Sequence, residues 1–538
     1  MKMEETVWRK PQPCYQAVLS LNLPPEAAFM YRSANNMVPL ASSSSLFAPP
    51  AFDGEYFSED VIVVGDENSK QFVLAGALTA FRSLSYFSLV KRGRFHSILL
   101  KQPNIRPDEE PEKVVVLTGD DWRLLLQRYA DLSARAMQVA PIRAAENVTG
   151  YCTWYYYYAD VTERDLLDNL AALGDEQKRA EYPAQYVQID DGYQTFQGDW
   201  LDQDSSWPTP LAEIGKRIRG AGMTGGIWLM PFLASSASRI FREHPDWFVQ
   251  DIRNQPLVFN GWSPPPDNYW ACLDATQPQV QAHLQNVFRT FRNWGFTLFK
   301  LDGLGFALPD GRRRDPDSTP VSAFRQGMQA IREAVPDCTL LGCGAPFMPC
   351  LGFVDHCRVS PDTARCWEPQ HQPNNSVVNT GAPSIVNALH STLTNWWMID
   401  RWFRADPDVL MARQDNAFYT VGEARLSVLT GILTGISVTS DNLNTIAPDR
   451  LALLKKAVHF RLHGPCPHQW KPDSWPQVFL GTCRGRRAAA IFNDSNEAMQ
   501  YSLAELGFAH TANEVLQDLG RIAGTLTLPP HDAALLIE

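Results

Sequence analysis

The chain has 538 residues, 45% of them hydrophobic, so it is longer than a single domain and two or three globular units with a sizeable core are expected. Its 59 acidic residues outnumber its 48 basic residues, and the net charge of -11 argues against nucleic acid or an anionic membrane as the main partner. The composition therefore favours a neutral or small ligand, and the 11% of aromatic residues suit the flat faces of sugars.

The first residues, MKMEETVWRKPQPCYQ, contain no apolar run behind a basic start, and no later stretch is apolar enough to span a bilayer. A cytoplasmic protein is therefore expected. The 10 cysteines stand at irregular spacings without a CxxC pair, which indicates reduced core thiols rather than a disulfide framework or a zinc site. We expect no metal and no cofactor, and the sequence leaves the oligomeric state open.

Short alternating runs separated by turn residues fill the first part of the chain, as in SEDVIVVGDENSKQFVLAGALTAF and RFHSILLKQP. This pattern is typical of antiparallel strands and predicts a β-sandwich domain over residues 1–145.

From residue 146 to residue 460, apolar strands alternate with amphipathic helical stretches, which is the pattern of βα units around a parallel sheet. The predicted strands are GYCTWYYYY, QYVQID, TGGIWLM, TLFKLD, CTLLGC, DHCRVS, DVLMAR and ISVTSD. Eight such units predict a (β/α)8 barrel, whose doubly buried strands could carry the aromatic run Tyr155 to Tyr158. Residues 461–538 return to short strands, such as RRAAAIFND and DAALLIE, and predict a small antiparallel β domain.

The fourth predicted barrel strand, LFKLDG, places Lys300 and Asp302 two positions apart and therefore on one face. Burying either charge is costly unless it is paired or functional. Active sites of such barrels lie where the strands end, and other strand ends also carry polar residues or tryptophan. These residues are Asp190, Asp191, Trp228, Cys343, Arg358, Asp362 and Asp441.

Six ordered stretches of the predicted barrel resemble the retaining α-galactosidases of glycoside hydrolase family 36, in clan D, and specifically a short bacterial three-domain branch. They are GYCTWYYYYADVTE, YVQIDDGYQTFQGDWL, GIWLMPFLA with REHPDWFV, LFKLDGL, GCGAPFMPCLGFVDHCRVSPDTARCWEP and NWWMIDRWFRADPDVLMAR. The resemblance implies release of terminal α-linked galactose from small oligosaccharides of the melibiose or raffinose type.

Retaining glycoside hydrolysis needs two carboxyl groups about 5 Å apart, one to attack the anomeric carbon and one to protonate the leaving oxygen. We predict that Asp302 is the nucleophile and that Lys300, on the same strand face, keeps it ionised. Asp362 in RVSPDT matches the acid/base position of the family, a role that needs a carboxyl held protonated until the leaving group departs. A barrel-rim salt bridge is the alternative for either residue.

The resemblance also implies a set of sugar-binding residues. Asp190 and Asp191 are expected to accept hydrogen bonds from sugar hydroxyls, although a DDG run can equally be a capping turn. Arg358 could donate to the sugar, or else be a structural partner of Asp355 or Asp190. The remaining expected contacts are Trp228, Lys300, Cys343, Trp367 and Asp441, of which Trp228 and Cys343 could equally be core residues.

In relatives, the N-terminal domain sends an aromatic loop over the pocket, and Phe52, Tyr56 and Phe57 are the candidates for that loop here. His244 and Trp247 in REHPDW match the family and are interpreted as structural residues.

Other classes of protein fit these residues less well. A Schiff-base aldolase would need a neutral lysine, whereas Lys300 faces carboxylates that favour its charged form. A divalent-metal hydrolase could use Asp190, Asp191 and Asp302, but no histidine stands at the strand ends. A non-catalytic sugar-binding protein would not need both Asp302 and Asp362. Within the family, an α-N-acetylgalactosaminidase and a galactosyltransferase of the raffinose or stachyose synthase type stay open.

Overall fold

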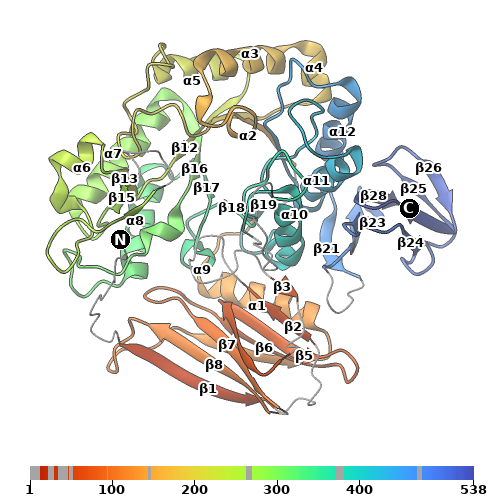
Figure 1. Ribbon diagram of the computed structural model, residues 1–538, viewed down its shortest axis with the longest axis horizontal. Helices are drawn as coiled ribbons and strands as arrows, with labels where there is room; N and C mark the ends of the chain where they lie inside the picture. The colour runs from red at the N-terminus through yellow and green to blue at the C-terminus, as the bar shows by residue number, and fades with distance from the viewer. Residues whose placement is uncertain are drawn as a thin grey trace, which may run out of the picture.

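The computed structural model describes residues 13–21, 29–33, 46–47, 52–93, 95–142, 147–261, 269–369, 381–468 and 475–538. Figure 1 shows three parts: β-sheets formed by the N-terminal residues below, a barrel of strands and helices above them, and β-sheets of the C-terminal residues at one side. The predicted architecture of a barrel flanked by two β regions is therefore confirmed.

Two antiparallel sheets make up the N-terminal region, because its strands alternate apolar and polar residues between turns. The four-stranded sheet has the order β1 (Cys14–Leu21), β8 (Phe95–Pro103), β7 (Tyr86–Arg92) and β4 (Gly54–Glu59). The five-stranded sheet has the order β3 (Leu46–Phe47), β2 (Phe29–Arg32), β5 (Val61–Asp66), β6 (Gln71–Ala77) and β9 (Val114–Gly119).

Eight parallel strands form the barrel and pair in chain order from the first to the seventh. They are β10 (Val148–Cys152), β11 (Tyr186–Ile189), β12 (Thr224–Leu229), β16 (Phe296–Leu301), β17 (Thr339–Gly342), β18 (His356–Arg358), β19 (Arg404–Asp406) and β20 (Ile436–Thr439). The last strand returns to the first through the register Val148 to Ile436. Within the described residues, β19 and β20 are not paired as strands, and the gap between them is bridged beyond the end of β19, where the backbone N–H of Leu410 donates to the carbonyl of Val438 over 2.7 Å.

Helices surround the barrel, and their ends follow the sequence signals for helix termini. Thr162 and Asp165 form a capping box at the start of α3, and Gly295, with a φ of 101°, ends α7 in a left-handed turn. The helices are α3 (Glu163–Gly174), α4 (Glu176–Glu181), α5 (Leu211–Gly220), α7 (Pro278–Trp294), α8 (Pro320–Ala334), α9 (Phe347–Cys350), α10 (Ile385–Thr394), α11 (Val421–Thr434) and α12 (Pro448–His459). Between β12 and α7 the chain forms α6 (Arg239–Glu243) and a small sheet of β13 (Leu233–Ser235), β14 (Val258–Asn260) and β15 (Tyr269–Cys272).

Two of the predicted barrel strands are corrected by the structure. The first strand ends at Cys152, and the aromatic run that follows forms the short helix α2 (Trp154–Tyr157) at the strand end instead of continuing the strand. The seventh strand lies at Arg404–Asp406 rather than at residues 408–413. Pro407 cannot donate to a sheet, and Asp408 has a left-handed φ of 78°, so the strand stops before them.

The N-terminal sheets and the barrel share one apolar core through α1 (Trp122–Ala136), which lies between them in Figure 1. Tyr129 of α1 packs on Trp397 and Trp402, with ring centroids 5.6 and 5.9 Å apart. Trp397 in turn donates its Nε1 hydrogen to the hydroxyl of Tyr31 over 2.8 Å. Side chains of both regions are thus buried in a single cluster.

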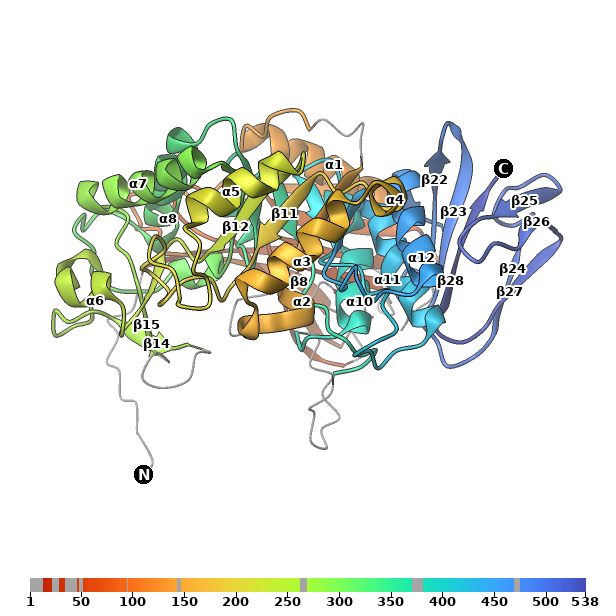
Figure 2. The same cartoon turned by 90° about the horizontal axis from the view of Figure 1, so that it is seen from above.

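The C-terminal region contains two antiparallel sheets beside the barrel (Figure 2). The larger has the order β21 (His463–Pro467), β22 (Val478–Cys483), β23 (Arg486–Asn493), β28 (Asp532–Ile537), β25 (Thr511–Glu514) and β26 (Gly520–Ala523), and the smaller pairs β24 (Met499–Ser502) with β27 (Thr525–Leu528). A second apolar cluster fills this region. Among the described residues, no helix has the length and apolar character needed to cross a membrane. The domain boundaries at residues 145 and 460 stay predictions.

Candidate active site

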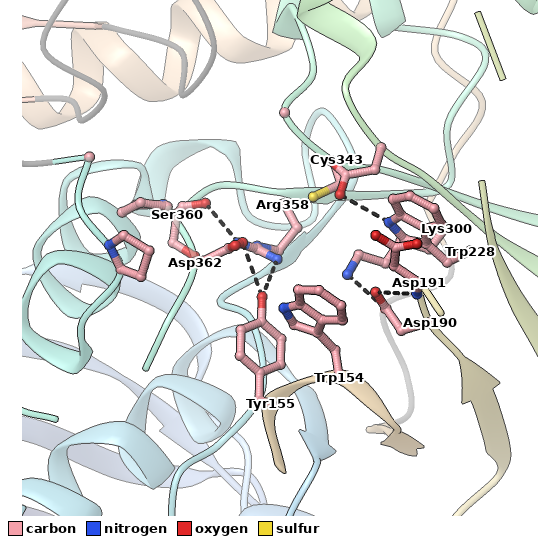
Figure 3. Close-up of a pocket in the computed structure, with 15 residues that line it drawn as sticks. Trp154, Tyr155, Asp190, Asp191, Trp228, Lys300, Cys343, Arg358, Ser360 and Asp362 are labelled. Carbon is pink, nitrogen blue, oxygen red and sulfur yellow. Dashed lines mark hydrogen bonds and ion pairs between the residues drawn. The ribbon is translucent and has the colours of Figure 1, made fainter. Parts of the chain in front are cut away.

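A cavity of about 400 Å³ opens at the carboxyl ends of the barrel strands, where the sequence places the candidate site. Figure 3 shows Asp362, Arg358 and Tyr155 together in one part of it, and Lys300, Asp190, Asp191 and Trp228 in another. The residues that line the cavity are Trp154, Tyr155, Asp190, Asp191, Trp228, Lys300, Asp302, Cys343, Gly344, Arg358, Ser360, Pro361, Asp362, Gly381 and Pro383. Eight of the ten predicted site residues are among them.

Asp302 follows directly on β16 and is held by hydrogen bonds to both carboxylate oxygens. The indole Nε1 of Trp228 donates to Oδ2 over 3.0 Å, and the backbone N–H of Gly303 donates to Oδ1 over 2.7 Å. Gly303 has a left-handed φ of 62°, which glycine adopts without strain. Donors to both oxygens fix the orientation of the carboxylate, as a nucleophile requires.

Lys300 forms its ion pair with Asp190, not with Asp302, which corrects the expected pairing. Its Nζ lies 2.9 Å from Oδ2 of Asp190, and both side chains are buried. Burial alone would lower the pKa of Lys300, but the charge of Asp190 outweighs it and holds the pKa well above the usual value. A lysine kept charged in this way is unsuited to Schiff-base chemistry.

The side chain of Asp190 is also the acceptor of other buried donors. The Nε2 group of Gln188 lies 2.6 Å from its Oδ2, and the thiol of Cys152 lies 3.3 Å away. These contacts fix Asp190 and, through it, the position of the Lys300 ammonium at the cavity wall.

Asp191 is buried at the cavity wall and accepts a hydrogen bond from Gln194. Burial raises its pKa to about 6, and the nearby charge of Asp190 acts in the same direction. Because ionising this buried carboxyl group is costly, its carboxylate would gain from hydrogen bonds donated by a ligand.

The raised pKa of Asp191 has a consequence for stability. In the unfolded chain its carboxyl loses its proton near pH 4, but in the folded protein only near pH 6. The folded state thus holds the proton more tightly, and the free energy of unfolding falls as the pH rises through this window. We expect Asp191→Asn to be more stable than the wild type at pH 8 by about 1–2 kcal/mol, with no difference near pH 4.

Denaturant unfolding at the two pH values measures this effect. Asp204 is a control of opposite sign, because the backbone N–H of Ser206 lowers its pKa, so Asp204→Asn should be less stable than the wild type at pH 8. If Asp191→Asn is destabilised equally at both pH values, the ionised carboxylate is not a cost to the fold.

Asp362 belongs to a network with Arg358 and Tyr155. The Nη2 group of Arg358 lies 2.7 Å from Oδ1 of Asp362, and the hydroxyl of Tyr155 donates to the same oxygen over 3.0 Å. Desolvation would raise the pKa of Asp362, but the charges of Arg358 and Lys300 hold it below its usual value. The structure therefore does not show the expected tuning of this carboxyl toward its protonated form.

Arg358 itself is almost fully buried, and neither of the partners suggested from the sequence binds it. Its guanidinium pairs with Asp362 and, over 3.1 Å, with Asp408, whereas Asp355 pairs with Arg332 and Asp190 with Lys300.

Two predicted site residues do not reach the cavity. Asp441 is fully buried and pairs with the equally buried Arg413 over 3.2 Å, so it is a structural residue of the barrel. Trp367 packs against His531, with ring centroids 4.8 Å apart, and does not line the cavity either. Strand-end position alone did not distinguish these two residues from the residues of the cavity wall.

The aromatic residues proposed to cover the pocket also lie elsewhere. Phe52 is 79% exposed, and its backbone N–H and carbonyl both bond to the hydroxyl of Tyr56. Phe57 packs on Tyr86, and none of these side chains lines the cavity as described. His244 stacks on Trp247 at a centroid distance of 3.9 Å, outside the cavity.

Sequence reasoning missed Trp154 and Tyr155, which line the cavity from α2. They were assigned to a continuous first strand. Ending that strand at Cys152 would have placed both residues at the carboxyl end of the barrel, among the other candidates. Ser360 and Pro361 line the cavity simply because they precede Asp362 on the same loop.

The fold and the site together define a (β/α)8 barrel protein with a carboxylate-lined cavity at its strand ends. Comparison with known proteins narrows this class. The Melibiase family model matches residues 109–291. Alpha-galactosidase AgaA of Geobacillus stearothermophilus is 26% identical over 155 residues, which are 28% of this chain and 20% of that protein.

An A type blood alpha-D-galactosamine galactosaminidase of Flavonifractor plautii is 28% identical over 141 residues, covering 25% of this chain and 12% of that protein. This chain thus aligns with only a minor part of each of these two relatives. Among solved structures, the alpha-galactosidase TtGalA of Thermus thermophilus in complex with p-nitrophenyl alpha-D-galactopyranoside superimposes with a TM-score of 0.69. That match has 23% identity and covers 88% of this chain and 92% of that one, which supports the fold.

These similarities agree with the resemblance of the chain's motifs to the alpha-galactosidases.

Proposed function

We propose that this protein is a retaining α-galactosidase that releases terminal α-linked galactose from small oligosaccharides of the melibiose or raffinose type. The observation that carries the proposal is the placement of Asp302 and Asp362, from the ends of the fourth and sixth strands, in one cavity with a buried lysine and arginine. A cavity of about 400 Å³ is in the size range of small-ligand sites.

In the first step of the proposed reaction, a carboxylate oxygen of Asp302 forms a bond with the anomeric carbon, and the bond from that carbon to the leaving oxygen breaks. Asp362 gives its proton to the leaving oxygen as the bond breaks. In the second step Asp362 takes a proton from water, the water oxygen bonds to the anomeric carbon, and Asp302 leaves as a carboxylate. The configuration at the anomeric carbon is retained.

The other cavity residues would hold the sugar. The carboxylates of Asp190 and Asp191 can accept hydrogen bonds from hydroxyls, and Lys300 and Arg358 can donate to them. Trp228 and Trp154 offer apolar ring faces to the apolar face of the sugar. The Cys343 thiol stays neutral, because burial raises its pKa well above the usual value, and it adds a small, weakly polar contact.

The second candidate is an enzyme for a galactoside altered at its second carbon, such as an α-N-acetylgalactosaminidase, and the observation that favours it is a matched relative named an alpha-D-galactosamine galactosaminidase. The two activities would share Asp302 and Asp362 and would differ in the space beside the second carbon of the sugar. A galactosyl-transferring enzyme would also share them and would differ in the molecule that attacks the intermediate.

Initial rates on three matched aryl glycosides test the proposal: the α-galactoside, the α-N-acetylgalactosaminide and the α-glucoside, with a metal chelator present. We expect cleavage of the α-galactoside at least about tenfold faster than the others, because buried groups that bind one hydroxyl arrangement are left unpaired by another. Galactose released from melibiose, without transfer to added sugar, supports hydrolysis. Faster cleavage of the α-N-acetylgalactosaminide would favour the second candidate function. Loss of activity with the chelator would contradict the proposed mechanism.

A further inference from the structure

Behind the cavity wall lies a buried carboxyl group, that of Asp408, which the proposed reaction does not use. Asp408 follows β19, is 4% exposed and does not line the cavity. One of its oxygens, Oδ1, lies 3.1 Å from Nη1 of Arg358, and the other accepts the backbone N–H of Thr363 over 2.8 Å.

Arg358 is therefore shared by two carboxylates. Its Nη1 group faces Asp408, and its Nη2 group lies 2.7 Å from Asp362. A buried guanidinium paired with Asp362 alone would strongly favour the ionised carboxylate, whereas a general acid must carry a proton. The second carboxylate cancels much of that positive charge.

We propose, on the basis of the glycosidase function above, that Asp408 is a positioning residue that holds Arg358 and balances its charge, so that Asp362 can carry the proton it gives to the leaving group. The hydrogen bond to Thr363 adds a mechanical part to this role, because Thr363 is the residue next to Asp362.

The electrostatics of the cluster show that both carboxyl groups compete for the charge of Arg358. Burial raises the pKa of Asp408 to about 6 against the opposing charge of Arg358, while the pKa of Asp362 lies below its usual value. The negative charge of Asp362 also acts to raise the pKa of Asp408, so the two carboxyl groups influence each other. The other titratable or charged groups that face the cluster are Tyr155 from α2, Lys300 from β16, Cys343 after β17 and Asp406 from β19.

The backbone at Asp408 makes asparagine a suitable replacement. Its φ of 78° lies in the left-handed region, which asparagine and aspartate tolerate better than other side chains. Asp408→Asn thus removes the charge and keeps the turn. Asp400 provides a matched control, because it also pairs with buried arginines, Arg404 and Arg461, and precedes the same strand at its opposite end.

The test is the pH dependence of kcat/KM for melibiose and for p-nitrophenyl α-galactoside. In Asp408→Asn, the pKa of Asp362 falls further, and the basic limb of the melibiose profile is expected to move down by about one to two pH units. At pH 7 the melibiose value should drop about tenfold or more, and the aryl value much less, because a good leaving group hardly needs the proton. In Asp400→Asn, the basic limb of the melibiose profile should stay at its wild-type pH.

An unmoved basic limb in Asp408→Asn, or equal losses on both substrates, would overturn the inference. If that variant does not fold, the single variant Arg358→Gln is compared with the double variant Arg358→Gln/Asp408→Asn, since neither leaves an unpaired buried guanidinium. The basic limb of the melibiose profile should lie at a lower pH in the double variant. A basic limb at the same pH in the single and the double variant would likewise overturn the inference. A wild-type protein inactive on both substrates would instead refute the proposed function itself.

Discussion

Replacement of Asp302 by alanine is expected to lower kcat for every α-galactoside by about 10³-fold or more, because Asp302 forms the covalent intermediate in the proposed reaction. Asp302 is the carboxylate at the end of β16 that is held by both Trp228 and Gly303. Its loss removes the attack on the anomeric carbon for good and poor leaving groups alike. Steady-state rates with an activated aryl α-galactoside give the most sensitive measurement.

Added azide separates a lost nucleophile from a damaged fold. In Asp302→Ala, azide can enter the vacated space and attack the anomeric carbon directly, which gives the β-galactosyl azide and releases the aryl alcohol. Asp310→Ala is a control on the same loop, because that residue is exposed and does not line the cavity. A variant at Asp302 that keeps more than about a tenth of the wild-type kcat would rule out this residue as the nucleophile.

Replacement of Asp362 by alanine is expected to act selectively. For melibiose, whose leaving group needs a proton, kcat/KM should fall by about 10²–10⁴-fold, which is the usual contribution of a general acid. For an activated aryl α-galactoside the loss in kcat/KM should be much smaller. The second step also loses its base, so the galactosyl-enzyme should accumulate and appear in the intact mass of the protein.

Azide again gives a distinguishing product. In Asp362→Ala it attacks the accumulated intermediate from the side of the departed leaving group, and the α-galactosyl azide forms. Losses of equal size on both substrates, or azide products of the same configuration in both variants, would contradict the assigned roles.

The motifs located the site better than they described its interactions. Strand-end positions brought Asp190, Asp302 and Asp362 to one cavity, because parallel strands in chain order place their carboxyl ends together. Which partner a buried charge selects was not predictable, since Lys300 could face a residue on its own strand or on another. It pairs with Asp190 of the second strand, although Asp302 is only two residues away in sequence.

The errors in the fold have local causes. Strand propensity is strong throughout GYCTWYYYY, so nothing in its composition marks the end at Cys152 and the turn into α2. The apolar run DVLMAR predicts the seventh strand, but in the described residues that run forms a single backbone bridge to a barrel strand, from Leu410 to Thr439, because Asp408 turns the chain beforehand. Asp441 was misplaced for a related reason: a polar residue at a strand end can serve the cavity or pair with Arg413 in the core.

The apolar cluster around α1 ties the folding of the N-terminal sheets to that of the barrel. Tyr129, Trp397 and Trp402 are each less than 2% exposed, and each would lose its packing if either region unfolded alone. We therefore expect the two regions to unfold together as one cooperative unit. The stability of the cavity then depends on the N-terminal sheets, although they contribute no side chain to its described wall.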